Sequence, residues 1–222
     1  AVLALIGTAL NGPSLLEAGT AHAQLGMRAV ALSCFESLTA DNMDVRTAII
    51  SGMMPENPNA DDGQPITAGG LLLDPLRAFP TSERPADVDA EQSGFDPYKY
   101  LIASILFAHL VKGSDSAKKL VRNIAVDHEG KVSSRNLKDG EEPDEDDPRS
   151  GLLQVIMSNF TMAIREQADA VRKDRSATAS GGVATGSSAA ADWTRVLVGY
   201  LILLATWLWD SPSSIRDFLQ ES

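Results

Sequence analysis

The sequence has little cysteine, few aromatic residues and no long run of positive charge. Cys34 is the only cysteine among the 222 residues, which excludes an internal disulfide framework and a metal site built from several cysteines. A single cysteine also fits a reducing, cytosolic compartment. Aromatic residues make up 5% of the chain, whereas Ala and Leu are plentiful. This composition favours a helical protein over a β-sandwich.

The charge balance excludes one large class of partner. The formal net charge is −11, and no stripe of Lys and Arg is visible, so nucleic acid is not an expected partner. The acidic balance also disfavours broad electrostatic adhesion to anionic lipid. Hydrophobic residues at 44% and charged residues at 22% are ordinary for a soluble globular protein.

Both ends of the sequence have a helical pattern. The chain opens with Ala1 in the apolar run AVLALIGTAL, which has no basic leader and resembles only the apolar part of a signal peptide. The other end, DFLQES, stops inside a helical pattern. We therefore expect a helix at each end and a chain that is a piece of a longer protein.

Four hydrophilic stretches are expected to be disordered loops. Three of them combine Pro, Asp and Gly, or carry dense negative charge, with seven acidic residues between Asp139 and Asp147. The fourth is a low-complexity Gly/Ser/Ala linker. The expected loops are residues 55–66, 80–95, 127–149 and 174–190.

Apolar residues at helical spacing predict helices between these loops. In the first segment, Leu25, Ala29, Leu32, Phe35 and Leu38 form the predicted buried face. Gly69, Gly70 and Pro75 predict a broken helix in the third, and no segment has a strand pattern. The predicted helices are 22–39, 43–54, 67–79, 96–112, 115–126, 151–172, 192–209 and 212–220. An all-α protein follows, and both a globular bundle and an α-solenoid fit it.

Residues 196–209, VLVGYLILLATWLW, contain no charge. A membrane-spanning helix needs about 20 apolar residues, whereas this run has 14 residues between Arg195 and Asp210. Its extension would bring in Asp192 and Arg195, each costing roughly 3 kcal/mol at a helix centre. We expect a core helix that is shielded by neighbours on both sides rather than a membrane anchor.

No catalytic, cofactor-binding or metal site is predicted. His22, His109 and His128 lie far apart in the sequence, without ligand spacing to one another or to Cys34. Each is expected to lie at the surface or in helix packing. Cys34 lies among residues of the predicted core face, so we expect a buried structural thiol rather than a nucleophile.

Three motif-like stretches have simpler interpretations. Residues 181–188, GGVATGSS, have Ser187 where a phosphate-binding loop requires Lys, and no strand precedes them. Asn159-Phe160-Thr161 matches the N-glycosylation tripeptide, but by chance, since it lies on an amphipathic helix. The acidic run at 139–147 is interpreted as a solvated loop, with a docking tail for a basic partner as the alternative. The residue chemistry favours a binding or scaffold protein over an enzyme.

Several segments together resemble one family. They are MRAVALSCFESLTADNMDVRTAIISGMMP, TAGGLLLDPL, YLIASILFAHLVKGSDSAKKLVRNIAV, SGLLQVIMSNF and TRVLVGYLILLATWLWDSPSSIRDFL. They are similar to the later armadillo-type repeats in the globular head of the general vesicular transport factor family. These proteins are long coiled-coil tethers of traffic from the endoplasmic reticulum to the Golgi. The resemblance covers most of residues 22–220, without the loops.

The resemblance implies that residues 1–222 are part of one armadillo-like head domain, a right-handed α-solenoid of helical hairpins or triplets. It implies a cytoplasmic protein at Golgi and vesicle membranes that docks vesicles before fusion. It also implies a homodimer through a coiled coil outside this sequence. The implied partners are a Rab-type GTPase, Golgi matrix proteins and SNARE machinery; no catalytic or binding residue is carried over.

One rival class stays open at this point. An unrelated armadillo- or HEAT-type adaptor would have the same helical array, and a downstream heptad pattern would separate the two, because an adaptor would lack it. An enzyme is the more distant alternative, and a cluster of titratable residues in a pocket would favour it.

Overall fold

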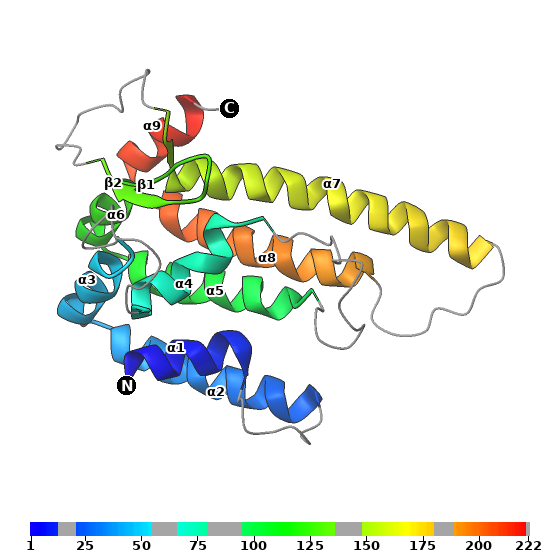
Figure 1. Ribbon diagram of the computed structural model, residues 1–222, viewed down its shortest axis with the longest axis horizontal. Helices are drawn as coiled ribbons and strands as arrows, with labels where there is room; N and C mark the ends of the chain where they lie inside the picture. Colours follow the sequence, from blue (N-terminus) through cyan, green and yellow to red (C-terminus); the bar gives the residue numbers. More distant parts are fainter. Residues whose placement is uncertain (13–20, 55–65, 80–94, 136–147, 180–188, 221–222) are drawn as a thin grey trace.

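The protein is predominantly helical. The computed structural model describes residues 1–12, 21–54, 66–79, 95–135, 148–179 and 189–220. Within these ranges lie nine helices and three short strands (Figure 1). The helices are α1 (Val2–Asn11), α2 (Ala21–Thr39), α3 (Met43–Ser51), α4 (Ala68–Arg77), α5 (Pro97–Val111), α6 (Asp115–Arg122), α7 (Leu152–Ala179), α8 (Ala189–Leu208) and α9 (Pro212–Gln220). The prediction of a mostly helical protein is confirmed.

Side-chain caps fix the starts of several helices. Asp96 accepts a hydrogen bond from the backbone N–H of Tyr98, at 3.0 Å, and Pro97 occupies the first position of α5. Thr67 accepts from the N–H of Gly70 at the start of α4, at 2.9 Å. Each cap satisfies an N–H group that has no partner within its own helix.

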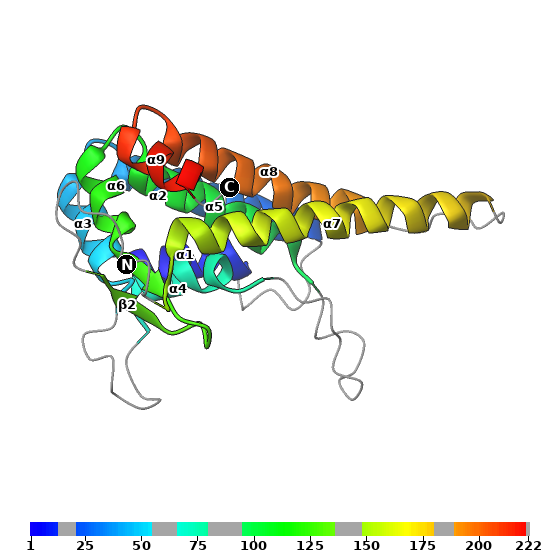
Figure 2. The ribbon, with the colours of Figure 1, turned by 90° about the horizontal axis from the view of Figure 1, so that it is seen from above.

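The long helices pack in three pairs. The pairs are α1 with α2, α4 with α5, and α7 with α8, and Figure 1 shows them one above the other. Neighbouring pairs join mainly through α5, which packs against α2 on one side and α8 on the other. Figure 2 shows that the C-terminal end of α7 extends beyond the other helices.

An ion pair between a buried arginine and a half-buried aspartate links the first helix pair to the second. Arg28 of α2 is 8% exposed, and its Nη2 lies 2.5 Å from Oδ2 of Asp96. Asp96, which caps α5, thus also pairs with the buried Arg28. Arg28 is thus a polar residue on the inner face of α2, where only apolar residues were predicted from the sequence.

The inner face of α2 differs from the predicted one. Ala31 and Phe35 are buried, whereas Ala29 is exposed and Leu25, Leu32 and Leu38 are only half-buried. Burial of Arg28 and Thr39 on the same side rotates the helix away from the predicted stripe. Only Phe35 of that stripe is fully buried.

Three short strands were not predicted. β1 (Ile124–Val126) pairs antiparallel with β2 (Val132–Ser134) and with β3 (Ser150–Gly151), in the order β2-β1-β3. The predicted helix 115–126 is therefore wrong beyond Arg122, because the apolar residues of β1 are buried as a central strand. Asp127 accepts hydrogen bonds from the N–H groups of Glu129 and Lys131 in the turn that follows.

Other boundaries also differ. α4 continues through Pro75, which lies in its last turn, so the predicted break is wrong. Two of the expected loop ranges overlap regular structure, since β2 lies within 127–149 and α7 continues to Ala179. Within those two ranges, residues 136–147 and 180–188 lie outside the described residues, as do 55–65 and 80–94 of the other two.

Candidate interaction surface

The inner face of α8 forms the centre of the packed core. The buried residues of this helix are Trp193, Val196, Gly199, Tyr200, Leu203, Leu204 and Trp207. They recur at steps of three and four, so they share one side of the helix. This side lies between α5 and α7.

Gly199 permits the close approach of α8 to α5. A Cβ atom at Gly199 would lie 2.9 Å from Cα of Leu101 and 3.2 Å from Oγ of Ser104. Any other residue would push the two helices apart at this point. The position of the glycine therefore decides which side of α8 faces inward.

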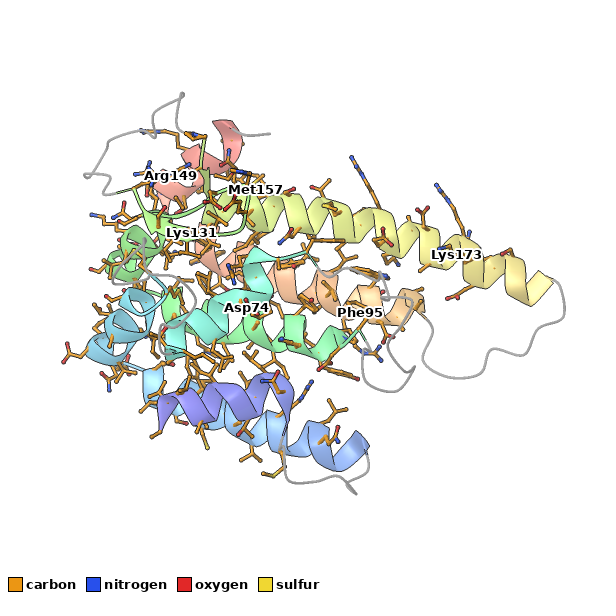
Figure 3. The ribbon with its side chains drawn as sticks, in the orientation of Figure 1. Asp74, Phe95, Lys131, Arg149, Met157 and Lys173 are labelled. Carbon is orange, nitrogen blue, oxygen red and sulfur yellow. The ribbon has the colours of Figure 1, made fainter. Side chains whose placement is uncertain are left out.

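Aromatic rings hold both ends of the inner face. The ring of Trp193 lies 4.7 Å from that of Phe95 and 5.7 Å from that of Phe79, centroid to centroid. Phe95 is labelled in Figure 3, just before the start of α5. At the other end, Trp207 stacks on Phe107 at 5.6 Å. Ring pairs at these separations add to the burial of apolar area.

The outer face of α8 is apolar and exposed. We define this face as Val198, Leu201, Ile202 and Ala205, which recur at helical spacing opposite the buried residues, together with Trp209 directly after the helix. Leu201 is 52% exposed and Trp209 is 78% exposed. The expectation of a core helix shielded on both sides is thus wrong for one side. A continuous apolar face of this kind is typical of a contact with other protein surface.

α8 is also the one described helix that is long and apolar enough to cross a membrane by length and composition. This test is passed by core helices of soluble proteins as well. The packing of its inner face against α5 and α7 agrees with a core helix on that side.

Among the described residues, the reactive and ligating side chains do not gather into one site. Within the described residues, no group of three or more His, Cys, Asp or Glu side chains could hold a metal ion. His128 is exposed on the turn between β1 and β2, whereas His109 is half-buried on α5, with its Nδ1 3.8 Å from Oε1 of Glu36. Burial lowers the pKa of His109, and Glu36 only partly offsets this effect. His22 lies on α2, and its side chain is outside the described ones.

Cys34 is exposed. The expectation of a buried thiol is therefore wrong, because the rotated face of α2 turns this residue to solvent. Asn159 has the opposite outcome: it is buried and its Nδ2 donates a hydrogen bond to the carbonyl of Leu76, at 3.1 Å. Asn159 therefore links α7 to α4, and this structural role has no relation to the glycosylation tripeptide.

Two tyrosines in the core have raised pKa values. Burial raises the pKa of Tyr200 well above its ordinary range, and the nearby Tyr100 adds to the effect. Burial also raises the pKa of Tyr100, with smaller contributions from Asp74 and Asp96. Both phenols therefore stay neutral at physiological pH, and their role in this site is packing.

A comparison with protein families identifies the type of protein to which this chain belongs. A search of curated proteins and a search of solved structures found no match. The sequence model of one family, described as "Uso1 / p115 like vesicle tethering protein, head region", matches residues 4–222. This match includes the whole of α2 to α9 and the small sheet, and α1 from residue 4 onward. The chain thus belongs to the Uso1/p115-like vesicle tethering proteins and forms part of their head region.

Proposed function

We propose that this chain acts in the head of a tether for ER-to-Golgi and intra-Golgi transport, and that it docks transport vesicles to target membranes before fusion. The observation that carries this proposal is the match of the tethering-protein head region to residues 4–222. Family membership supports a role in vesicle tethering. The specific transport step is the proposed part.

The helix order supports an armadillo-like array within a single head domain over residues 1–222. Two sets of three helices follow one another, each with a short helix and then a long pair: α3–α5 and α6–α8. The long helices α2, α5 and α8 lie side by side, as repeats in a solenoid do (Figure 1). An array of this type offers a long surface for partners and needs no chemistry to function.

The proposed partners are a Rab-type GTPase of the early secretory pathway, Golgi matrix and tethering proteins, and SNARE machinery. Homodimerisation would occur through a coiled coil outside this sequence. The proposed location is cytoplasmic, peripheral to Golgi membranes and to vesicles derived from the endoplasmic reticulum. These proposals rest on the family, whose members are tethering proteins rather than a known enzyme family, and we propose that this chain is not an enzyme.

A direct binding experiment tests the partner proposal. Purified early-secretory Rab proteins, loaded with a GTP analogue or with GDP, would be passed over the immobilised chain. We expect binding that depends on the GTP analogue, because a tether must respond to the active GTPase. Equal binding in both nucleotide states, or none with a chain shown by circular dichroism to be folded, would contradict the proposal.

A matched pair of variants tests whether the outer face of α8 contributes to Rab binding. Leu201→Glu places a charge on this face, whereas Ile164→Glu places one on an exposed position of α7. Loss of Rab binding in the first variant alone would locate the contact on α8. Equal binding by both variants would locate it elsewhere in the head.

A further inference from the structure

Three chain segments have the same local structure. Each is eight residues long and connects a long helix to the short helix that follows: Thr39–Arg46, Val111–Lys118 and Leu208–Ile215. We call them the first, second and third corners. Their sequences are TADNMDVR, VKGSDSAK and LWDSPSSI, which share almost no residue identity.

The backbone of the three corners follows one pattern. The third residue of each has a positive φ: 52° at Asp41, 63° at Gly113 and 52° at Asp210. The N–H of the fourth residue bonds to the carbonyl of the first, at 3.4, 3.3 and 3.2 Å in chain order. The N–H of the eighth bonds to the carbonyl of the fourth, at 3.2, 3.1 and 2.9 Å. The corners are therefore structurally equivalent, position by position.

The fourth residue of each corner is the N-cap of the short helix. In the first corner, Oδ1 of Asn42 accepts from the N–H of Val45 at 3.2 Å. In the second, Oγ of Ser114 accepts from the N–H of Ala117 at 3.1 Å. In the third, Oγ of Ser211 lies 2.9 Å from Oγ of Ser214. The first two contacts are caps of a helix N–H, which set where the short helix begins, whereas in the third corner the side chain of Ser211 bonds to another side chain.

The second residue of each corner has a carbonyl at the C-terminal end of a long helix. Such carbonyls lack a partner within their own helix, and they carry the negative end of the helix dipole. A cationic donor nearby would both satisfy the hydrogen bond and complement the charge.

The eighth residue supplies that donor to the next corner. Arg46, the eighth residue of the first corner, donates from Nη1 to the carbonyl of Lys112, the second residue of the second corner, at 2.8 Å. Lys118, the eighth residue of the second corner, donates from Nζ to the carbonyl of Trp209, the second residue of the third. The same position thus contacts the same position in both steps along the array.

Further contacts hold Arg46 and Lys118 close to the carbonyl groups that accept their hydrogen bonds. Arg46 also donates from Nε to the carbonyl of Thr39 in its own corner, at 2.7 Å, so it bridges the ends of α2 and α5. Lys118 is buried beneath the third corner, near Asp115 and Asp210. Figure 1 shows α3, α6 and α9 along one edge of the molecule, where the three corners lie. At the third corner the eighth residue is Ile215, so the series has two steps within the described residues.

We propose that Arg46 and Lys118 are equivalent clamps, each of which closes one set of three helices by binding, from the short helix, the end of the last helix of that set at the next corner. The clamps set how the last long helix of each set is placed relative to the short helix that begins the set, because each joins that short helix to the C-terminal end of that long helix. This device holds the corner edge of the array in register although the corners have few identical residues. It does not depend on the proposed transport function.

Hydrogen–deuterium exchange at the corners tests this proposal in the full 222-residue chain. Methionine keeps the apolar stem of each cation but offers no donor. We expect Arg46→Met to speed exchange at the second corner by about ten- to hundredfold and to leave the third unchanged. Lys118→Met should speed exchange at the third corner by a similar factor and leave the first unchanged. Lys173→Met, on the far part of α7 (Figure 3), is the control and should change neither.

Two results with the methionine variants would overturn the proposal. One is unchanged exchange at the next corner in both methionine variants. The other is uniform acceleration along the whole chain, since a clamp acts at its own step. Lys118→Arg covers the case in which Lys118→Met does not fold, because it keeps a cationic donor: protection of the third corner should stay within about threefold of the wild type. Loss of protection there in Lys118→Arg would show that side-chain shape rather than the donor matters, and would also overturn the proposal.

Discussion

At the scale of single residues, some glycines lie where the backbones of two helices come closest together. Gly69 starts α4 beside the end of α3, where a Cβ atom would lie 2.1 Å from the carbonyl oxygen of Ile49 and 2.5 Å from the backbone nitrogen of Met53. Gly26 lies on the exposed side of α2, where a Cβ atom would meet nothing within 4 Å. These two positions form a matched pair.

We predict opposite effects of alanine at these positions. Gly69→Ala should lower the free energy of unfolding by about 3 kcal/mol or more, because backbone atoms cannot move aside. Gly26→Ala should raise it by about 0.5–1 kcal/mol, since alanine favours the helix. Urea denaturation measures both. A Gly69→Ala protein as stable as the wild type would contradict the packing of α4 on α3.

His109 should make the stability of the protein depend on pH. Its pKa is lowered from 6.5 by burial first, and the cations Lys112 and Arg46 lower it further. The unfolded chain therefore binds a proton at a higher pH than the folded one. The stabilising contribution of neutral His109 is fully present above pH 6.5 and is lost as the pH falls through the folded pKa.

Denaturation at a series of pH values between 7.5 and 5 measures this loss, with His109→Gln as the control. The difference in unfolding free energy between wild type and variant should shrink or reverse as the pH falls. A difference that stays constant over this range would show that His109 has an unshifted pKa.

At the scale of elements, the two faces of α8 should respond differently to the loss of a side chain. Leu203 faces inward and is fully buried, whereas Leu201 faces outward. Leu203→Ala should lower the free energy of unfolding by about 2–5 kcal/mol. Leu201→Ala should change it by about 0.5 kcal/mol or less. Equal losses in both variants would mean that α8 is covered on both sides.

The helices could be predicted from the sequence because their signals are local. Asp96-Pro97 and Ser211-Pro212 gave the correct starts of α5 and α9. The buried face of α2 was harder to predict from the sequence, because the ion pair between Arg28 and Asp96 joins residues far apart in the chain. A charged residue is not expected on a buried face unless its partner is known.

The strands and the open face of α8 depend on tertiary contacts. β1 continues a helical pattern in sequence, and only its pairing with Val132–Ser134 and Ser150–Gly151 makes it a strand. Apolar residues on both sides of α8 predicted burial on both sides, although only one side is packed. The corners did carry a sequence signal: a residue that tolerates positive φ, Asp or Gly, stands directly before Asn or Ser at each N-cap.

At the scale of the whole molecule, the outer face of α8 should promote self-association. Val198, Leu201 and Ile202 are exposed side by side, and apolar surface of this kind tends to become covered. We predict concentration-dependent oligomers of the 222-residue chain in analytical ultracentrifugation. The double variant Leu201→Glu/Ile202→Glu should shift the chain toward monomer, whereas Ile164→Glu should not. A monodisperse wild-type monomer at high concentration would contradict this prediction.

The measurement that tests the tethering account most directly is a docking reaction between ER-derived vesicles and Golgi membranes in cytosol. Purified, folded chain would be added as a competitor, because under the proposed function this part of the head binds partners but does not bridge two membranes by itself. We predict inhibition of docking that rises with the concentration of the chain, while heat-unfolded chain has no effect. Docking that proceeds unchanged at a large excess of folded chain would contradict the account.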